Sequence, residues 1–318
     1  MNLKISGKKV VVFGGTGFIG SHLVNGLCKE ACQVDIVTRS NKKKLDFFIG
    51  NEPGQIRIVK INSFTKDNID LVINGADIVF NLIGILYETR QNSFKNIHEE
   101  IPRKLASSAS RMGVRNFVHI SALNIEKSKD SAYANSKLLG ENTVKENFPN
   151  SVIVRPGVVF GKGDNFTNFF YSLSKISPIL PLIGTPEIKR NNSFFPMINF
   201  RKKVRFQPIY VVDLVNVLIN ICILKKKVLE LAGPTIQTFD EIFDIILRRK
   251  GKKRFYLPIP FFVARILAFF LEILPHPVLT RDQIKLLKID NISPRGFSNL
   301  KNFVKNPSSL HTIIGGYL

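Results

Sequence analysis

Three residues near the middle of the chain have the types and spacing of an acid/base group acting on a carbonyl or carbinol. Tyr133 and Lys137 are four residues apart and would share one face of a helix. A phenol has a free pKa of about 10, and an adjacent ammonium favours its ionised form. Ser121 lies twelve residues before Tyr133, and its hydroxyl can orient a substrate oxygen. We predict a catalytic group, with surface helix residues as the alternative for Tyr133 and Lys137.

Position along the chain strengthens this interpretation. Residues 115–121 have the pattern of a strand that ends in Ser121, and the helix carrying Tyr133 opens after the next loop. A serine at a strand end, followed by a tyrosine at a helix start, brings both side chains to one edge of a parallel sheet.

The N-terminal segment has the pattern of a strand, a glycine loop and a helix. An apolar strand begins by Lys9, and residues 18–30 have helical spacing. Gly14 permits a tight turn, Gly17 lets the backbone approach a pyrophosphate, and Gly20 lets the helix pack closely on the strand. Free N–H groups at the helix start would face the anion. The residues predicted around this anion are Gly14, Thr16, Gly17, Phe18, Ile19 and Gly20.

The tip of the next strand, residues 33–38, decides which dinucleotide fits. An acidic residue there would bind the ribose hydroxyls of NAD, but the tip reads Arg39 and Ser40, followed by three lysines. Arg39 can stack on adenine and hold a 2′-phosphate, so we expect NADP(H), with NAD(H) as the alternative. Asp35 lies inside the strand, and we interpret it as an outward-facing strand residue.

Strands alternate with helices throughout the first half, which predicts an α/β fold with a Rossmann-type, doubly wound parallel sheet. Further strands are expected at 56–61, 77–84, 115–121 and 151–155, and a long helix at 94–112. Ligands bind beyond the carboxyl ends of such strands. Asn62 is therefore expected near the adenine, and Leu82, Ile83 and Gly84 near the ribose or nicotinamide.

The spacing becomes irregular after Arg155, with Gly, Pro and Asn between short elements. We predict an NAD(P)-binding Rossmann domain at 1–155 and a smaller α+β C-terminal region at 156–318, packed over the mouth of the sheet. A basic insert at 185–205 is expected to form a loop or to contact a partner. Thr238 and Glu241 have the spacing of a capping box at the start of a helix.

Charge and composition restrict the class of partner. The net charge is +22 and the isoelectric point is about 10.0. Basic runs without interleaved aromatic residues argue against nucleic acid and favour an anionic membrane surface or an acidic protein complex. The three cysteines and five histidines show no ligand spacing, so no metal site is predicted. No apolar stretch reaches about 18 residues, so we expect neither a transmembrane helix nor a signal peptide.

One apolar helix is expected between prolines at residues 260–274. It is too short to span a bilayer. Arg265 and Glu272 share one face, opposite a wide surface of Phe, Leu and Ile. This helix is either buried in the C-terminal region or contacts a membrane interface or a partner.

Together these features resemble the extended and atypical short-chain dehydrogenase/reductase superfamily, and more narrowly the NAD(P)H-binding accessory subunits of respiratory complex I and their bacterial relatives. The superfamily resemblance rests on the glycine loop, Ser121, Tyr133 with Lys137, and the Arg155-Pro156-Gly157 sequence. The narrower one rests on the segments 81–86, 155–161, 180–184, 206–213 and 279–287.

The resemblance implies a nucleotide site that includes Gly14, Gly17, Gly20 and Arg39, with Pro156 in the later motif. It also implies an accessory subunit peripheral to the inner membrane at the cytoplasmic, matrix-equivalent face. Respiratory complex I subunits would be its partners, and the nucleotide would be held mainly for structure. The alternatives are an NADP-dependent oxidoreductase or sugar-nucleotide epimerase/dehydratase that uses Ser121, Tyr133 and Lys137, and a nucleotide-responsive regulator.

Overall fold

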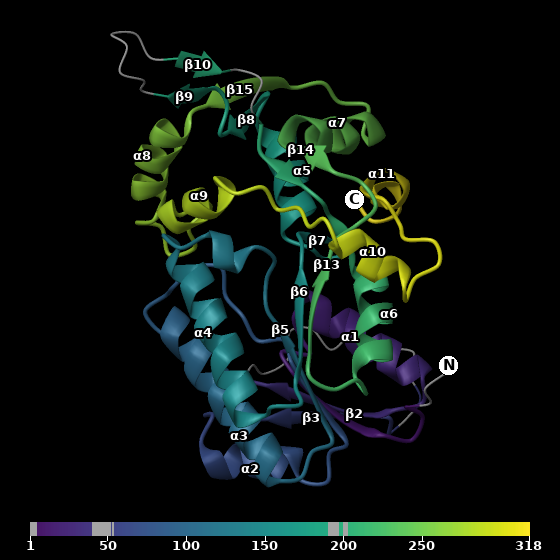
Figure 1. The fold of residues 1–318 in the computed structure, drawn as a ribbon. Coiled ribbons are helices and arrows are strands. Elements are labelled where there is room, and N and C mark those ends of the chain that lie inside the picture. The colour runs from purple at the N-terminus through teal and green to yellow at the C-terminus, as the bar shows by residue number, and fades with distance from the viewer. Residues whose placement is uncertain (1–4, 40–51, 53, 190–196, 200–202) are drawn as a thin grey trace.

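The centre of the molecule is a seven-stranded parallel sheet (Figure 1). The structure is a computed structural model that describes residues 5–39, 52, 54–189, 197–199 and 203–318. The strands are ordered β3, β2, β1, β4, β5, β6 and β13 across the sheet. Their bounds are β1 (Lys9–Phe13), β2 (Gln33–Thr38), β3 (Ile56–Lys60), β4 (Ile78–Asn81), β5 (Asn116–Ile120), β6 (Val152–Pro156) and β13 (Lys227–Leu231). The prediction of a Rossmann-type α/β fold is confirmed.

Helices cover both faces of this sheet. One face packs against α1 (Phe18–Lys29), α6 (Val211–Ile221) and α10 (Gly296–Lys301), and the other against α2 (Lys66–Ile73), α3 (Ile101–Arg111) and α4 (Ala132–Asn147). Side chains of a strand alternate between faces, so Val10 and Val12 enter the first core while Val11 and Phe13 enter the second. All four side chains are fully buried, which explains the uninterrupted apolar run in β1.

Strand β13 joins the sheet from the second half of the chain. It pairs in parallel with β6, with Lys227 opposite Val152 and Leu231 opposite Pro156. Helix α6, which precedes it, packs against α1. Residues 1–155 therefore do not contain the whole sheet, and the chain crosses back over the predicted boundary before it completes the C-terminal region.

The C-terminal region combines short helices with two-stranded sheets above the central sheet. Its core is rich in phenylalanine, and Phe206, Phe239 and Phe243 are buried in it. The capping box of Thr238 and Glu241 is confirmed at the start of α7. The elements are β7 (Val159–Phe160), α5 (Phe166–Ile176), β8 (Ile179–Ile183), β9 (Glu187–Lys189), β10 (Met197–Asn199), β11 (Arg205–Phe206), β12 (Ile209–Tyr210), β14 (Gln237–Thr238), α7 (Phe239–Arg249), β15 (Phe255–Ile259), α8 (Phe261–Leu271), α9 (Arg281–Leu287) and α11 (Leu310–Ile313).

The structure differs in detail from three expectations based on the sequence. The helix at 94–112 begins as a π-helical turn, η2 (Lys95–Glu100), and continues as α3, where Pro102 provides no N–H for a regular α-helical bond. Strand β4 ends at Asn81, earlier than 84, because the Asn81 side chain accepts a hydrogen bond from the N–H of Ile83 and turns the chain. The insert at 185–205 lies partly outside the described residues, and β9 and β10 within it form an antiparallel pair.

Among the described residues, no helix has both the length and the apolar character needed to cross a bilayer.

The close approach of α1 to the glycine loop gives the first testable prediction. A Cβ added to Gly20 would lie 2.2 Å from the carbonyl oxygen of Gly14. Gly20→Ala should therefore displace α1 and lower the free energy of unfolding by about 1–3 kcal/mol, as overpacked sites do. Chemical denaturation measures this change. Gly316→Ala is the control, because a Cβ there meets no atom within 4 Å; equal stability of the two variants would contradict the close packing.

Candidate functional site

The predicted site residues gather at one edge of the sheet, where the parallel strands end. Gly14 follows β1, Arg39 follows β2, and Ser121 follows β5. The chain order reverses between β1 and β4, and ligands of doubly wound sheets bind at this crevice. A Cβ on Gly14 would lie 3.1 Å from the backbone carbon of Leu82 after β4, so glycine keeps the two strand ends close. Gly14 also has a φ of +81°, which other residues rarely adopt.

The glycine loop ends in an N–H-rich helix start. The N–H of Gly17 donates to the Gly14 carbonyl over 3.0 Å, which closes the turn. Gly17 is the N-cap of α1, with no side-chain cap and no acidic residue in the first turn. Gly17 is exposed, and Thr16, Phe18 and Ile19 are partly exposed. A dinucleotide pyrophosphate fits this loop, because no side chain of the described residues caps the N–H groups of the helix start, which lie at the edge where ligands bind.

The predicted adenine end of the site is open. Arg39 is exposed, and its guanidinium donates to the side-chain oxygen of Asn92 over 3.2 Å. Asn62 is exposed beyond β3. Ser40 lies outside the described residues. Asp35 was predicted to be an outward-facing strand residue, but it is buried, and Arg57 on the neighbouring strand holds its carboxylate with two hydrogen bonds of 2.8 and 2.5 Å.

Lys137 is buried beside the ends of β4 and β5. Its Nζ donates to the carbonyl of Ile120 over 2.8 Å, and a Cβ on Gly84 would lie 3.7 Å from the same nitrogen. Burial lowers the pKa of Lys137 to about 8, although the carboxylate of Glu141 opposes the shift. The structure therefore brings Lys137 and Gly84 together, as the sequence predicted for one site.

Tyr133 differs from the sequence-based expectation. We expected the Lys137 ammonium to lower the pKa of the phenol. Instead, burial raises the pKa of Tyr133 to about 12, and within the described chain its hydroxyl makes no hydrogen bond to Lys137. Its ring packs edge-on against Phe94 and His98, with centroids 5.9 and 5.3 Å away. The phenol is thus held in its neutral, proton-donating form near neutral pH.

His98 belongs to this site, although the sequence indicated only that the histidines have no ligand spacing. Its Nε2 accepts from the N–H of Ile85 over 3.1 Å, which places the ring proton on Nδ1, 2.8 Å from the hydroxyl of Ser136. Burial, with the Lys137 charge as a second cause, lowers the pKa of His98 to about 3. A neutral His98 therefore fixes the loop after β4 against α4. Its contact with Tyr133 could not be predicted from their spacing in the sequence, because His98 lies in a different element, the π-helix η2.

Two buried polar atoms at the end of β5 lack a partner. The hydroxyl of Ser121 and Nε2 of His119 make no hydrogen bond within the part of the chain that the structure describes. Side chains of a strand alternate between its faces, so both residues lie on the same sheet face as the buried Phe117, which is the face that carries α3 and α4. Unsatisfied buried polar groups are rare and mark ligand or water sites, so this corner fits the polar end of a dinucleotide or a substrate oxygen.

Asp282 of α9 controls the start of α4 and was not identified from the sequence. Its carboxylate accepts from the Ser131 hydroxyl over 2.8 Å, and from the N–H groups of Ala132 and Tyr133 over 2.8 and 3.0 Å. A carboxylate at a helix start satisfies otherwise unpaired N–H groups and favours the helix dipole. The C-terminal region therefore positions the helix that carries Tyr133 and Lys137.

Pro156 is buried at the end of β6, where its carbonyl accepts from the N–H of Leu123 over 3.1 Å. It orders the loop after Ser121. No cluster of His, Cys, Asp or Glu side chains suited to a metal ion occurs among the described residues.

The depressed pKa of Lys137 predicts a pH-dependent stability. Its pKa is about 8 in the folded protein against 10.5 unfolded, so the unfolded state holds more protons between these values and stability rises with pH. Replacing Lys137 with Met removes this titrating group and with it this pH dependence. The stability of the nucleotide-free wild type relative to Lys137→Met should rise by about 2 kcal/mol from about pH 8 to about pH 10.

Urea unfolding of both proteins at each pH measures this difference and cancels the opposing effect of the three buried cysteines, whose pKa values burial raises. Lys104→Met, at an exposed position of α3, is the control. A wild-type advantage over Lys137→Met that does not change with pH would contradict the desolvation of Lys137.

Comparison with known proteins identifies relatives that extend along most of the chain. A family described as NAD(P)H-binding matches residues 14–168. NADH dehydrogenase (ubiquinone) 1 alpha subcomplex subunit 9, mitochondrial, of Mus musculus is 27% identical over 311 residues, which cover 96% of this chain and 78% of that protein. The protein of the same name from Arabidopsis thaliana is 30% identical over 305 residues, covering 91% and 71%.

Among solved structures, UDP-glucuronic acid 4-epimerase from Bacillus cereus, in complex with UDP-glucuronic acid and NAD, superposes with a TM-score of 0.70 at 16% identity over 97% of both chains. This likeness shows the shared fold. The identity with the plant protein extends along most of both chains, and the chain therefore belongs to the family of NADH dehydrogenase (ubiquinone) 1 alpha subcomplex subunit 9 proteins.

Proposed function

We propose that this protein is an NADP(H)-binding accessory subunit of respiratory complex I, in which the nucleotide serves mainly to stabilise the fold. The observation that carries the proposal is the family relationship over most of the chain, combined with an intact glycine loop at the crevice between β1 and β4. Bound nucleotide would span β1, β4 and α4, and so tie α4 to two strands that already pair through their backbones.

The proposed cofactor residues come from the site residues that the sequence predicted. Gly14, Gly17 and Gly20 would carry the pyrophosphate, and Arg39 the 2′-phosphate, because no carboxylate lies at the tip of β2 among the described residues. Lys137, Gly84 and the unpaired Ser121 hydroxyl would meet the nicotinamide end. When bound, the cofactor supplies hydride chemistry, while the protein supplies position and charge.

Peripheral attachment to the cytoplasmic, matrix-equivalent face of the membrane is the second part of the proposal. Helix α8 buries only Ala264 and Ala268, and exposes a set of large apolar side chains: Phe262, Ile266, Leu267, Phe269 and Phe270. The other expectation, a helix buried in the C-terminal region, does not fit these exposed side chains. An exposed apolar helix on a chain of net charge +22 suits an anionic membrane interface beside a partner complex.

A second candidate function is that of an NADP-dependent oxidoreductase or a sugar-nucleotide epimerase/dehydratase. The observation that favours it is the unpartnered Ser121 hydroxyl at the same sheet edge as Tyr133. In this function the neutral phenol would donate a proton to a substrate oxygen held by Ser121. Tyr133→Phe would abolish turnover of a substrate, whereas it would leave nucleotide retention by an accessory subunit nearly unchanged.

Arg39 gives a test of cofactor choice. Charge-assisted hydrogen bonds to phosphate contribute about 1.5–3 kcal/mol, so Arg39→Ser should weaken NADPH binding roughly 10- to 100-fold. Binding of NADH, which has no 2′-phosphate, should change much less. Fluorescence titration with both nucleotides measures the two constants. Arg115→Ser removes the same charge at the opposite edge of the sheet, before β5, and should affect neither. Equal losses for NADPH and NADH would refute 2′-phosphate recognition by Arg39.

Association with complex I is tested in membranes of the source organism. A tagged full-length chain should comigrate with complex I subunits on blue-native gels, and Gly20→Ala, which disturbs the nucleotide loop, should lower the comigrating fraction. Gly316→Ala is the matched control. Absence of complex I subunits from the tagged wild-type band would overturn the proposed role.

A further inference from the structure

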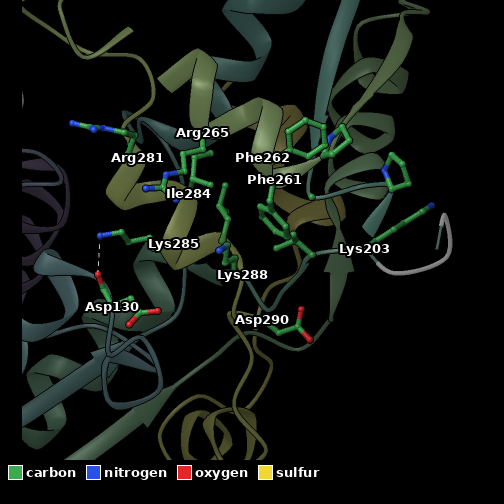
Figure 2. A pocket seen from close by; sticks show the side chains of 15 residues that line it. Asp130, Lys203, Phe261, Phe262, Arg265, Arg281, Ile284, Lys285, Lys288 and Asp290 are labelled. Atoms are coloured by element: carbon green, nitrogen blue, oxygen red, sulfur yellow. Dashed lines mark hydrogen bonds between the residues drawn. The ribbon is translucent and has the colours of Figure 1, made fainter. Parts of the chain in front are cut away.

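A cavity of about 610 Å³ lies between α8 and α9, away from the glycine loop at Gly14, Gly17 and Gly20. Its walls also include Gly184 and Pro186 after β8, Val204, and Asp130 before α4. Five cationic side chains line it against two carboxylates: Lys203, Arg265, Arg281, Lys285 and Lys288 against Asp130 and Asp290. Figure 2 shows Arg265 of α8, Lys285 of α9 and Lys288, which directly follows α9, around this space. The cavity is therefore suited to an anion.

The cations differ in how far they are neutralised. Arg281 is paired with Glu272 at 2.7 Å, and Lys203 with Asp240 at 2.5 Å. Lys285 donates to the backbone carbonyl of Asp130 over 2.8 Å, seen as the dashed line in Figure 2. The carboxylate of Asp290 is occupied by Arg205.

Arg265 and Lys288 are exposed, and neither side chain has an ion-pair or hydrogen-bond partner in the described ranges. These two side chains, one from α8 and one from the residue that follows α9, are available for a ligand phosphate.

The same cavity is continuous with an apolar surface. Phe261 and Phe262 line it, and Phe262 is 58% exposed. The small side chains of Ala264 and Ala268 let α8 pack on Ile284 of α9, which turns the larger residues outward. Phe269 and Phe270 are 51% and 61% exposed. A water-soluble anion would use the cations but leave this surface in water, whereas an amphiphile uses both.

We infer that the α8–α9 cavity binds the phosphate headgroup of an anionic membrane phospholipid through Arg265 and Lys288, with the acyl chains directed along the exposed apolar side chains of α8. This inference rests on the proposed peripheral attachment and adds a specific lipid contact to it. Helix α8 then lies in the membrane interface, and the headgroup bridges α8 and α9.

The test uses the full chain and compares a double variant with a charge-matched control. The variant Arg265→Gln/Lys288→Gln removes the two unpaired cations, and Lys104→Gln/Arg115→Gln removes an exposed Lys and an exposed Arg far from α8. Flotation with vesicles of phosphatidylcholine and phosphatidylglycerol should show at least about a tenfold loss of binding for Arg265→Gln/Lys288→Gln. The loss for Lys104→Gln/Arg115→Gln should be less than about threefold. Equal losses would show unspecific charge attraction and would overturn the site.

Monomeric short-chain lipids separate the possible sources of the phosphate. Dihexanoyl-phosphatidylglycerol should raise the Tm of the wild type and of the control pair but not that of the cavity pair. Dihexanoyl-phosphatidylcholine should have a much smaller effect. An equal rise with inorganic phosphate would identify a free-anion site and refute the lipid. Failure of the wild type to bind these vesicles would refute the lipid site and favour a protein as the partner of α8. Lipid binding by a wild type that does not comigrate with complex I would refute the subunit role alone.

Discussion

A buried ion pair between α4 and β6 holds the candidate site together. The side chain of Glu141 is fully buried, and Arg155 binds it with two hydrogen bonds of 2.7 and 2.8 Å. A second carboxylate, Glu126, contacts the same guanidinium at 2.6 Å. Loss of one member of such a pair leaves a desolvated charge and costs about 3–5 kcal/mol. Because Tyr133, Lys137 and Glu141 follow one another at single turns of α4, this pair fixes the helix in rotation as well as in position.

The C-terminal region reaches the same helix from its other end through Asp282. This carboxylate lies on α9, one residue after Arg281, whose guanidinium binds Glu272 beyond the end of α8. The surface proposed for the membrane and the start of the nucleotide-facing helix are thus two contacts apart. If binding ordered one of them, these contacts would favour order in the other, and bound nucleotide could stabilise an attached subunit by this route.

Much of the fold and part of the site were predictable from local patterns. Apolar runs identified the first strands, and the glycine spacing identified the turn at Gly14 and the close contact at Gly20, because these depend on neighbours in the chain. Long-range contacts were not predictable. The sequence could not indicate that β13 completes the sheet, that Arg57 pairs with the buried Asp35, or that burial would outweigh the Lys137 charge at Tyr133. Desolvation depends on packing from distant segments, and periodicity contains no information about it.

The sequence by itself determined the α/β class, the glycine loop, the basic tip at Arg39 and the family to which the chain belongs, since each follows from residue types at fixed spacing. The tertiary structure alone decided the state of the site. It placed His98 against Tyr133, left the Ser121 hydroxyl without a partner and brought Asp282 to the start of α4. It also showed that α8 exposes its apolar side chains. These properties arise from burial and from contacts between segments that are distant in the chain, such as Asp282 and Ala132, which are 150 residues apart and which only folding brings together.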